Sequence, residues 1–291
     1  MFQDFALEMI ELPEATLRVR HGGSGPPLLL WHGHPRTHTT WHRVAPMLAQ
    51  HFTVVCPDLR GFGRSSKPAD QPHHEGSSKR AKARDSVALM RHLGFETFNL
   101  AGHDRGSYTA FRTAMDHPGV VTRLAVLDSV PLLEALERCD AKFAQAWWHW
   151  FFFAQPEKPE RAILQDPNAW YRHSPTMATE MGPGNYEDYQ WAIHDPETVH
   201  GMVEDYRAGL TIDQQHDRED RTAGRRLQCP TLVLWSEQDD LAELYGDVLN
   251  VWRPWTTELS GHSIASGHHM AEEAPDQVAE TLINFFLDQQ R

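Results

Sequence analysis

The stretch that decides the fold is Phe98-Asn99-Leu100-Ala101-Gly102-His103-Asp104-Arg105-Gly106-Ser107. It begins as an apolar run typical of a buried strand, and the amphipathic pattern of a helix follows over residues 108–115. Gly102 and Gly106 flank the sharp turn between the two elements, because residues without a Cβ let a strand and a helix approach closely. The sequence therefore predicts strand, turn and helix, with Asp104 at the tip of the turn.

This Gly-x-Asp-x-Gly turn resembles the nucleophile elbow of α/β-hydrolases, in which the central residue attacks the substrate. Esterases of that fold carry a serine where this chain has Asp104. A carboxylate is already ionised at neutral pH and can displace a leaving group from a saturated carbon, which gives an aspartyl ester that water must then hydrolyse. Asp104 thus indicates a carbon–halogen bond or an epoxide as the target. The alternative is an ordinary turn that uses Asp and Gly for their backbone tolerance.

The composition limits the classes of protein to which the chain can belong. Its 291 residues are enough for one large domain or for a core with an insertion. The hydrophobic fraction of 40% and the charged fraction of 23% are those of an ordinary globular protein. A formal net charge of −13 argues against nucleic acid or an anionic membrane surface as the main partner.

Three features predict where the protein resides. No run of 18 apolar residues indicates a membrane-spanning helix, and the first residues lack the basic and apolar segments of a signal peptide. Cys56, Cys139 and Cys229 are far apart and odd in number, so their spacing fits neither a disulfide framework nor a zinc site. We therefore expect a cytoplasmic protein.

Short apolar runs between turn residues predict the remaining strands. We expect a hairpin over 7–11 and 15–21, and further strands over 27–31, 53–57, 122–128, 229–235 and about 256–264. Helices are expected over about 79–93 and 275–289. Together these elements predict an α/β-hydrolase fold: a mostly parallel eight-stranded sheet flanked by helices.

The composition changes between residues 133 and 220. The strand signal disappears there, aromatic residues crowd together, and helical spacing alternates with proline-rich breaks. We expect an α-helical cap over 133–220, inserted between core segments 1–132 and 221–291. The row Trp147-Trp148-His149-Trp150 suits the roof of a pocket, although aromatic stripes on helices are more often part of a core.

The tetrapeptide His32-Gly33-His34-Pro35 follows the predicted strand over 27–31. In α/β-hydrolases the oxyanion hole takes one backbone N–H from this loop and one from the residue after the nucleophile. We therefore expect the N–H groups of His34 and Arg105 to stabilise the oxyanion that forms during ester hydrolysis. His-x-His at a strand end, with His38 and His42 beyond it, leaves a metallohydrolase as an alternative.

Carboxylates end two of the predicted parallel strands. Asp128 ends the strand over 122–128, at the sheet edge where such folds place their sites, so it can orient a catalytic histidine. Asp239 and Asp240 follow the strand over 229–235 and offer the alternative acid. We expect Asp128 to be the acid of the triad.

The catalytic base is expected in the loop after the last strand. His268 directly follows Gly267 and is preferred there to His262 and His269. Elsewhere, six Lys and Arg residues occur over 64–84, which we interpret as a solvated loop and helix start without a function.

Nearly the whole chain resembles the fluoroacetate, or haloacetate, dehalogenases of the α/β-hydrolase superfamily. The resembling stretches follow one another in the same order: His32-Gly33-x-Pro35, Trp41-His42-Arg43-Val44-Ala45-Pro46, Gly102-His103-Asp104-Arg105-Gly106, Ala125-Val126-Leu127-Asp128, His149-Trp150, Glu204-Asp205-Tyr206-Arg207-Ala208-Gly209, Ser266-Gly267-His268 and Glu272-Glu273-Ala274-Pro275-Asp276. Several such matches in order are more specific than any one of them.

The resemblance implies a role for each matching residue. These are the nucleophile Asp104, the base His268, its orienting acid Asp128, Arg105 for the substrate carboxylate, and a halide pocket of His149, Trp150 and Tyr206. A departing fluoride is strongly hydrated, so its pocket must present several hydrogen-bond donors. The resemblance also implies a homodimer that needs no metal or other cofactor.

The chain departs from the family at Tyr108, where fluoroacetate-specific members carry a second arginine. An arginine–carboxylate bond contributes about 1.5–3 kcal/mol, so its loss should weaken binding of small haloacids. Arg112 lies one turn further along the expected helix. Tyr108 also favours an alternative, because epoxide hydrolases combine an Asp nucleophile with tyrosines that protonate the opening epoxide, a role Tyr206 could fill.

We therefore expect a hydrolytic dehalogenase of small halogenated acids that forms an aspartyl ester. Epoxide hydrolysis by the same nucleophile is the second hypothesis. A metal-dependent hydrolase and a non-catalytic member that only binds small ligands are further alternatives.

Overall fold

The computed structural model describes residues 1–288, and its centre is one eight-stranded sheet. The strand order is β1-β2-β4-β3-β5-β6-β7-β8, in which β2 pairs antiparallel with β1 and β4 while all other pairs are parallel. The strands are β1 (Ala6–Glu11), β2 (Thr16–Gly23), β3 (Pro27–Trp31), β4 (Thr53–Pro57), β5 (Phe98–His103), β6 (Val121–Leu127), β7 (Thr231–Ser236) and β8 (Leu259–Ile264). This is the mostly parallel sheet that the sequence predicts.

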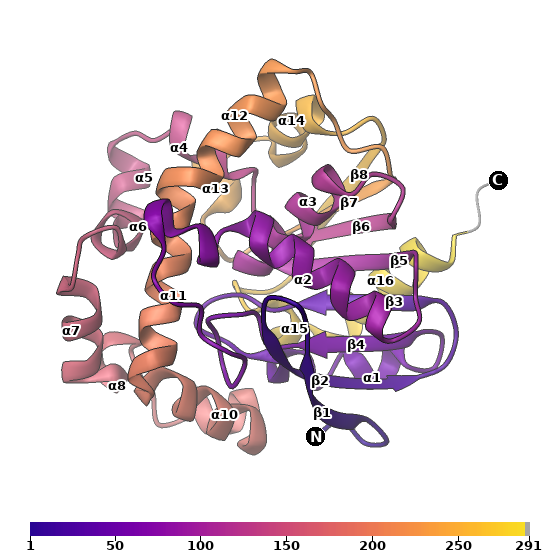
Figure 1. Cartoon of the computed structure of the whole chain (residues 1–291), viewed down its shortest axis with the longest axis horizontal. Helices are drawn as coiled ribbons and strands as arrows, with labels where there is room; N and C mark the ends of the chain where they lie inside the picture. The colour runs from indigo at the N-terminus through magenta and orange to yellow at the C-terminus, as the bar shows by residue number, and fades with distance from the viewer. Residues whose placement is uncertain (289–291) are drawn as a thin grey trace.

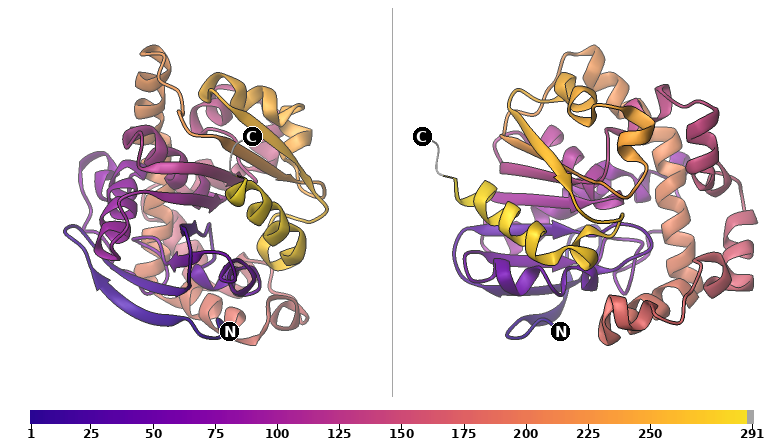
Figure 2. Two further views of the ribbon diagram at one scale, coloured as in Figure 1. Left: turned by 90° about the vertical axis from the view of Figure 1, so that its right-hand side faces the viewer. Right: turned by 180° about the vertical axis from the view of Figure 1, so that it is seen from behind.

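Helices cover both faces of the sheet because its strands are apolar on both sides. On β3, Leu29 and Trp31 belong to the core under α2 (Lys79–His92) and α3 (Arg105–Asp116). Leu28 and Leu30 point the other way, into the core under α1 (Ala45–Leu48) and α16 (Pro275–Leu287). Figures 1 and 2 show α2 and α3 on one face and α16 on the opposite one.

Between β6 and β7 the structure contains helices and no strand, and Figure 1 shows most of this segment beside the sheet, at the left. Its elements are α4 (Leu132–Glu137), α5 (Ala141–Ala146), α6 (Trp148–Phe153), α7 (Lys158–Gln165), α8 (Pro167–Trp170), α9 (Met177–Met181), α10 (Pro183–His194), α11 (Pro196–Ala208), the π-helical turn η3 (Gly209–Asp213) and α12 (Gln214–Thr222). We call this segment the cap; the boundaries 133 and 220 stay a prediction.

The remaining elements are short and lie in loops around the sheet. They are η1 (His38–Trp41), η2 (Pro72–Ser77), α13 (Leu241–Tyr245), α14 (Val248–Trp252), η4 (Arg253–Trp255) and α15 (Met270–Glu273). Within residues 1–288, no helix has the length and apolarity that crossing a bilayer requires.

Two expectations need correction. The last strand begins at Leu259 rather than near 256, because Thr256 makes only an isolated bridge to Leu227. The basic residues over 64–84 are not all solvated, since Lys79 and Lys82 are only 2% and 1% exposed. The expected end of the last helix at 289 lies outside the described residues, and α16 ends at Leu287.

Candidate active site

The turn between β5 and α3 has the strained geometry that its glycines predict. Asp104 has a φ of 50° and a ψ of −119°, a conformation that residues with a Cβ rarely adopt. A Cβ at Gly102 would lie 2.3 Å from the carbonyl oxygen of Gly106, and one at Gly106 would lie 2.4 Å from that of His32. Both positions must therefore be glycine for the strand and the helix to meet.

Backbone N–H groups hold the carboxylate of Asp104. Its Oδ1 accepts a hydrogen bond of 2.6 Å from the N–H of His34, and the nearby backbone N–H of Arg105 helps to lower the pKa of this carboxyl group. A Cβ at Gly33 would lie 2.3 Å from the same oxygen, so residue 33 has to lack a side chain. Burial raises the pKa of Asp104, but nearby positive charges, led by that of His268, hold it below its usual value. Asp104 is therefore an ionised carboxylate at neutral pH.

The histidine beside Asp104 is His268. Its Nε2 lies 3.8 Å from Oδ2 of Asp104. Its Nδ1 lies 2.8 Å from a carboxylate oxygen of Asp128 and 2.9 Å from one of Asp239. Burial lowers the pKa of His268, but the hydrogen bonds to these two carboxylates outweigh burial and raise it well above the usual value. Asp128 and Asp239 were alternatives in the sequence, and the structure places both on the same nitrogen.

The two carboxylates reach His268 from neighbouring strands. Asp128 directly follows β6, and its Oδ1 accepts the N–H of Ser236 at 2.9 Å. Asp239 follows β7 in the adjacent loop. Burial raises the pKa of Asp128, whereas in Asp239 the bond to His268 outweighs burial and lowers the pKa to about 2.

The other candidate histidines lie elsewhere or have other partners. His262 is exposed on β8, whereas His269 lines the same cavity as His268. The rings of His32, His38 and His42 bond respectively to Leu59 N–H, Asp58 and the Thr39 carbonyl oxygen. Within residues 1–288, His38 lies in a cluster of close potential ligand atoms with Asp58 and Asp188, whereas no such cluster contains His32, His34 or His42, so the histidines of this loop do not converge on one site.

A cavity of about 320 Å³ opens above Asp104. Three side chains that line it, His149, Trp150 and Tyr206, make no side-chain hydrogen bond to any other residue of the described chain. Burial lowers the pKa of His149 to about 4 and raises that of Tyr206 well above 10. Both side chains are therefore neutral, and each offers a hydrogen-bond donor to a ligand.

The aromatic row predicted as a pocket roof lines the cavity only in part. Trp147, His149 and Trp150 face the cavity, whereas Trp148 is 47% exposed and lies outside it. The Nε1 of Trp147 donates to both carboxylate oxygens of Asp240, at 3.0 and 2.9 Å. One turn of α6 thus points partly into the site and partly to solvent, as helical geometry requires.

The guanidinium of Arg105 does not line the cavity. Its Nε donates to Asp205 Oδ2 at 2.5 Å and its Nη2 to the Asp205 carbonyl oxygen at 3.0 Å, while its buried Nη1 has no partner within residues 1–288. It lies behind the ring of Tyr206, 4.1 Å from the ring centroid. The expected contact between Arg105 and a substrate carboxylate stays a prediction.

Tyr108 and Arg112 lie on the same helix as Arg105 but in different surroundings. Tyr108 lines the cavity, and burial raises the pKa of its phenol, which keeps the hydroxyl protonated. Arg112 bonds to Asp116, Asp217 and Asp220 and does not line the cavity. It therefore does not replace the second arginine of the family.

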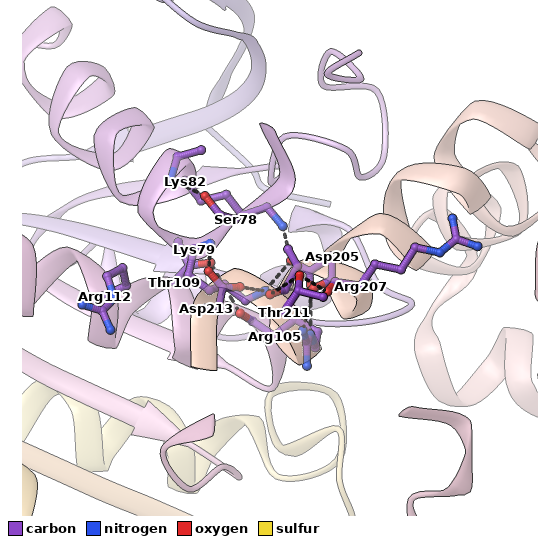
Figure 3. Close-up of polar contacts among 12 residues, drawn as sticks. Ser78, Lys79, Lys82, Arg105, Thr109, Arg112, Asp205, Arg207, Thr211 and Asp213 are labelled. Carbon is purple, nitrogen blue, oxygen red and sulfur yellow. Dashed lines mark hydrogen bonds and ion pairs between the residues drawn. The ribbon is translucent and has the colours of Figure 1, made fainter. Parts of the chain in front are cut away.

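Sequence reasoning missed the ion pairs behind the cavity. Asp205 accepts hydrogen bonds from both Lys79 and Lys82 as well as from Arg105 (Figure 3). The only local signal was the spacing of the two lysines, which places them three apart on one face of a helix. Asp205 itself drew attention only through the family resemblance.

Known proteins of similar sequence and structure indicate the fold and the family of the chain. A family model described as alpha/beta hydrolase fold matches residues 26–275. A fluoroacetate dehalogenase from Burkholderia sp. is 42% identical over 99% of this chain and 96% of its own. A soluble epoxide hydrolase from Corynebacterium sp. (strain C12) is 32% identical over 91% of each chain. A crystal structure of a proposed α/β-hydrolase from Nostoc sp. PCC 7120 has a TM-score of 0.94 at 40% identity, and covers 99% of this chain and 100% of that one.

Proposed function

Because the chain belongs to the haloacetate dehalogenase family of the α/β-hydrolase superfamily, we propose that it hydrolyses the carbon–halogen bond of small halogenated acids. One observation carries the proposal: an ionised carboxylate, Asp104, lies at the base of a cavity with His268 Nε2 at 3.8 Å. Three hydrogen-bond donors of that cavity are free to bind the leaving halide: His149, Trp150 and Tyr206.

In the first half of the reaction, Oδ2 of Asp104 attacks the carbon that bears the halogen. The carbon–halogen bond breaks, its electron pair leaves with the halide, and an ester joins the substrate carbon to Asp104. Hydrogen bonds from His149, Trp150 and Tyr206 replace the water that a small halide would otherwise bind. Oδ2 is the attacking oxygen because Oδ1 is already held by the N–H of His34.

In the second half, water hydrolyses the ester. Nε2 of His268 takes a proton from the water as its oxygen attacks Cγ of Asp104, and the negative charge develops on Oδ1. The N–H groups of His34 and Arg105 stabilise that oxyanion, while Asp128 and Asp239 stabilise the imidazolium. Collapse breaks the bond between Cγ and Oδ2, the imidazolium of His268 gives its proton to the leaving oxygen, and the product departs as the hydroxy acid. The carboxyl group of Asp104, which now contains the oxygen of the water, loses its proton to solvent and is again a carboxylate.

Epoxide hydrolysis is the second candidate, and Tyr108 is the observation that favours it. This residue stands where a second carboxylate-binding arginine is expected, and its phenol lines the cavity. Tyr206 offers another protonated phenol there. A tyrosine can donate its proton to the oxygen of an opening epoxide, and both reactions would share the ester on Asp104.

The test is a panel of fluoro-, chloro- and bromoacetate with several epoxides, with released halide and diol measured. We expect halide release from at least one haloacetate and a stable ester in the His268→Asn variant. The ester appears as a mass increment on the peptide that contains Asp104, and Asp104→Asn is the control without it. Diol formation with no halide release would select the epoxide hydrolase, and the absence of an ester with every substrate that the wild type converts would refute the mechanism.

The proposal extends to location and assembly. We place the enzyme in the cytoplasm, in line with its three cysteines, Cys56, Cys139 and Cys229, which are all free thiols. We further propose a homodimer, for which Trp148 and Phe151 offer exposed apolar surface on α6. Sedimentation analysis tests the homodimer, and a monomer at micromolar concentration would contradict it.

A further inference from the structure

Figure 3 shows a cluster of charged side chains around Asp205, all of them buried. Asp205 of α11 is its centre and accepts from Lys79 Nζ at 2.7 Å, from Lys82 Nζ and from Arg105 Nε at 2.5 Å. Asp213 of η3 accepts the N–H of Lys79 at 2.9 Å, and its Oδ2 lies 3.6 Å from Lys79 Nζ. We call these five residues the Asp205 cluster.

The cluster carries more positive than negative charge. Three cations and two carboxylates leave one formal positive charge, and every member is at least 97% buried. A buried charge without a partner is costly, and one buried donor, Nη1 of Arg105, has no hydrogen bond within the described chain. Because water is excluded, this excess charge is poorly screened and acts on neighbouring sites.

The excess charge lies next to the cavity. The guanidinium carbon of Arg105 is 4.1, 5.0 and 5.4 Å from the ring centroids of Tyr206, Tyr108 and Trp150. All three rings line the cavity, so only one layer of aromatic side chains separates the cluster from a ligand. The cluster and the cavity are also adjacent in sequence. Arg105 of the cluster directly follows Asp104 of the cavity, and Tyr206 of the cavity directly follows Asp205 of the cluster.

The walls of the cavity carry an excess of negative charge. They carry the carboxylates of Asp104, Asp128, Asp239 and Asp240, against one positive charge, the imidazolium of His268. A ligand with its own carboxylate would be repelled by this surplus of negative charge. A positive charge behind the aromatic wall offsets the repulsion.

We propose that Lys79, Lys82 and Asp205 determine specificity for anionic ligands. Asp205 positions the guanidinium of Arg105 behind the aromatic wall, and the two lysines give the cluster its net positive charge. The substrate class follows: the cavity prefers a carboxylate to its neutral amide of the same shape. This inference deepens the proposed function, but it concerns the charge of the ligand rather than the bond that is broken.

The main test removes one cation. Binding of acetate and of acetamide is measured by ligand-observed NMR in the wild type and in Lys82→Met, which keeps most of the side chain's apolar contact. We expect acetate affinity to fall on the order of tenfold and acetamide affinity to stay within about twofold. The matched control is Lys67→Met, which removes the same charge from a lysine that donates only to the carbonyl oxygens of Gly63 and Ser65.

Two results would overturn the proposal. One is unchanged acetate affinity in folded Lys82→Met, and the other is an equal loss of acetate and acetamide affinity, which would mean a damaged cavity. Halide release in the wild type is measured separately, so a failure of the dehalogenase proposal does not decide this one. An enzyme that releases no halide but prefers acetate to acetamide through Lys82 would still support it.

If Lys82→Met does not fold, the pH dependence of binding decides. Burial, which outweighs Asp205, lowers the pKa of Lys82 to about 8, so the cluster loses a charge between pH 7 and 9. The ionisable groups that face Lys82 are Lys79, Asp85, Asp205, Arg105 and His32, and burial lowers the pKa of His32 to about 4, so it stays neutral.

This measurement uses the His268→Asn variant, because His268 would otherwise lose its charge in the cavity as the pH rises. We expect acetate affinity to fall several-fold from pH 7 to 9 while acetamide affinity stays constant. Acetate affinity that does not change with pH would overturn the proposal.

Discussion

Arg105 and Arg112 lie on the same helix, two turns apart, and are both almost fully buried, yet their surroundings differ. Arg112 bonds to three carboxylates, of which Asp217 and Asp220 belong to α12 of the cap. Arg105 shares one cap carboxylate, Asp205, with two lysines and leaves Nη1 without a partner. Its bonds to two cap carboxylates make Arg112 a link between core and cap, whereas the excess of cations around Asp205 makes Arg105 a source of charge for the cavity.

The largest expected effect is on stability, at Arg112. Arg112→Met leaves Asp217 and Asp220 buried without their main partner, so the free energy of unfolding should fall by about 3–5 kcal/mol. Urea denaturation followed by circular dichroism measures it. Below the melting temperature, kcat/KM should stay near that of the wild type. A decrease in the free energy of unfolding under about 1 kcal/mol would show that the ion pairs of Arg112 with Asp217 and Asp220 do not hold the cap to the core.

Arg105→Met should have the opposite effect: a smaller loss of stability and a larger loss of kcat/KM than Arg112→Met. Asp205 keeps Lys79 and Lys82, so stability should fall less than in Arg112→Met. The loss of the positive charge behind the aromatic wall should lower kcat/KM for haloacetates about tenfold, because that charge attracts the substrate carboxylate through the wall. Steady-state halide release measures it, with kcat/KM for a neutral epoxide as the internal reference. Equal losses of kcat/KM for haloacetates and for the epoxide would contradict the prediction, because they would mean that Arg105 does not act through the charge of the substrate.

Tyr108→Arg tests whether the cavity can use a second cation. The new guanidinium would face the cavity directly, where Tyr108 now lies. On the strength of one arginine–carboxylate bond, kcat/KM for haloacetates should rise about tenfold. Tyr108→Phe is the matched control, because it keeps the ring and removes only the hydroxyl. An unchanged or lower kcat/KM in Tyr108→Arg would mean that a second positive charge at the cavity does not improve binding of the substrate carboxylate beyond what Arg105 provides.

The smallest expected effect is a shift in the pH profile. Nε2 of His268 must be neutral to accept a proton, so ester hydrolysis is lost as the pH falls through the pKa of His268. Asp128 and Asp239 raise that pKa, and Asp239→Asn should therefore move the acid limb of kcat to lower pH, by about one unit. The profile of Arg112→Met should match that of the wild type. An unmoved acid limb in Asp239→Asn would assign the effect to Asp128 alone.

Local patterns in the sequence predicted much of the site. The elbow at Asp104 could be predicted because its glycines are required by contacts with adjacent elements, and His268 because it directly follows a glycine in the loop after the last strand. The choice between Asp128 and Asp239 could not be made from strand ends alone. The structure shows why: β6 and β7 are neighbours, so both carboxylates reach the same nitrogen.

Charge patterns were less informative. Lysines on a helix that begins after a polar loop are usually solvated, and this general rule failed at Lys79 and Lys82. Their partner, Asp205, lies more than 120 residues further along the chain, beyond the range of any helical spacing. A pairing at that distance in sequence leaves no local signal.

The sequence by itself determined the strand–turn–helix around Asp104 and the parallel sheet, since both follow from short-range sterics and apolar periodicity, and it supplied the residue types of the proposed catalytic groups. Only the tertiary structure decided that two carboxylates share His268, that Arg105 lies behind an aromatic wall rather than in the cavity, and that two lysines are buried beside it. The physical reason is that the balance of buried charge depends on which distant segments exclude water from one another, and no local pattern encodes that.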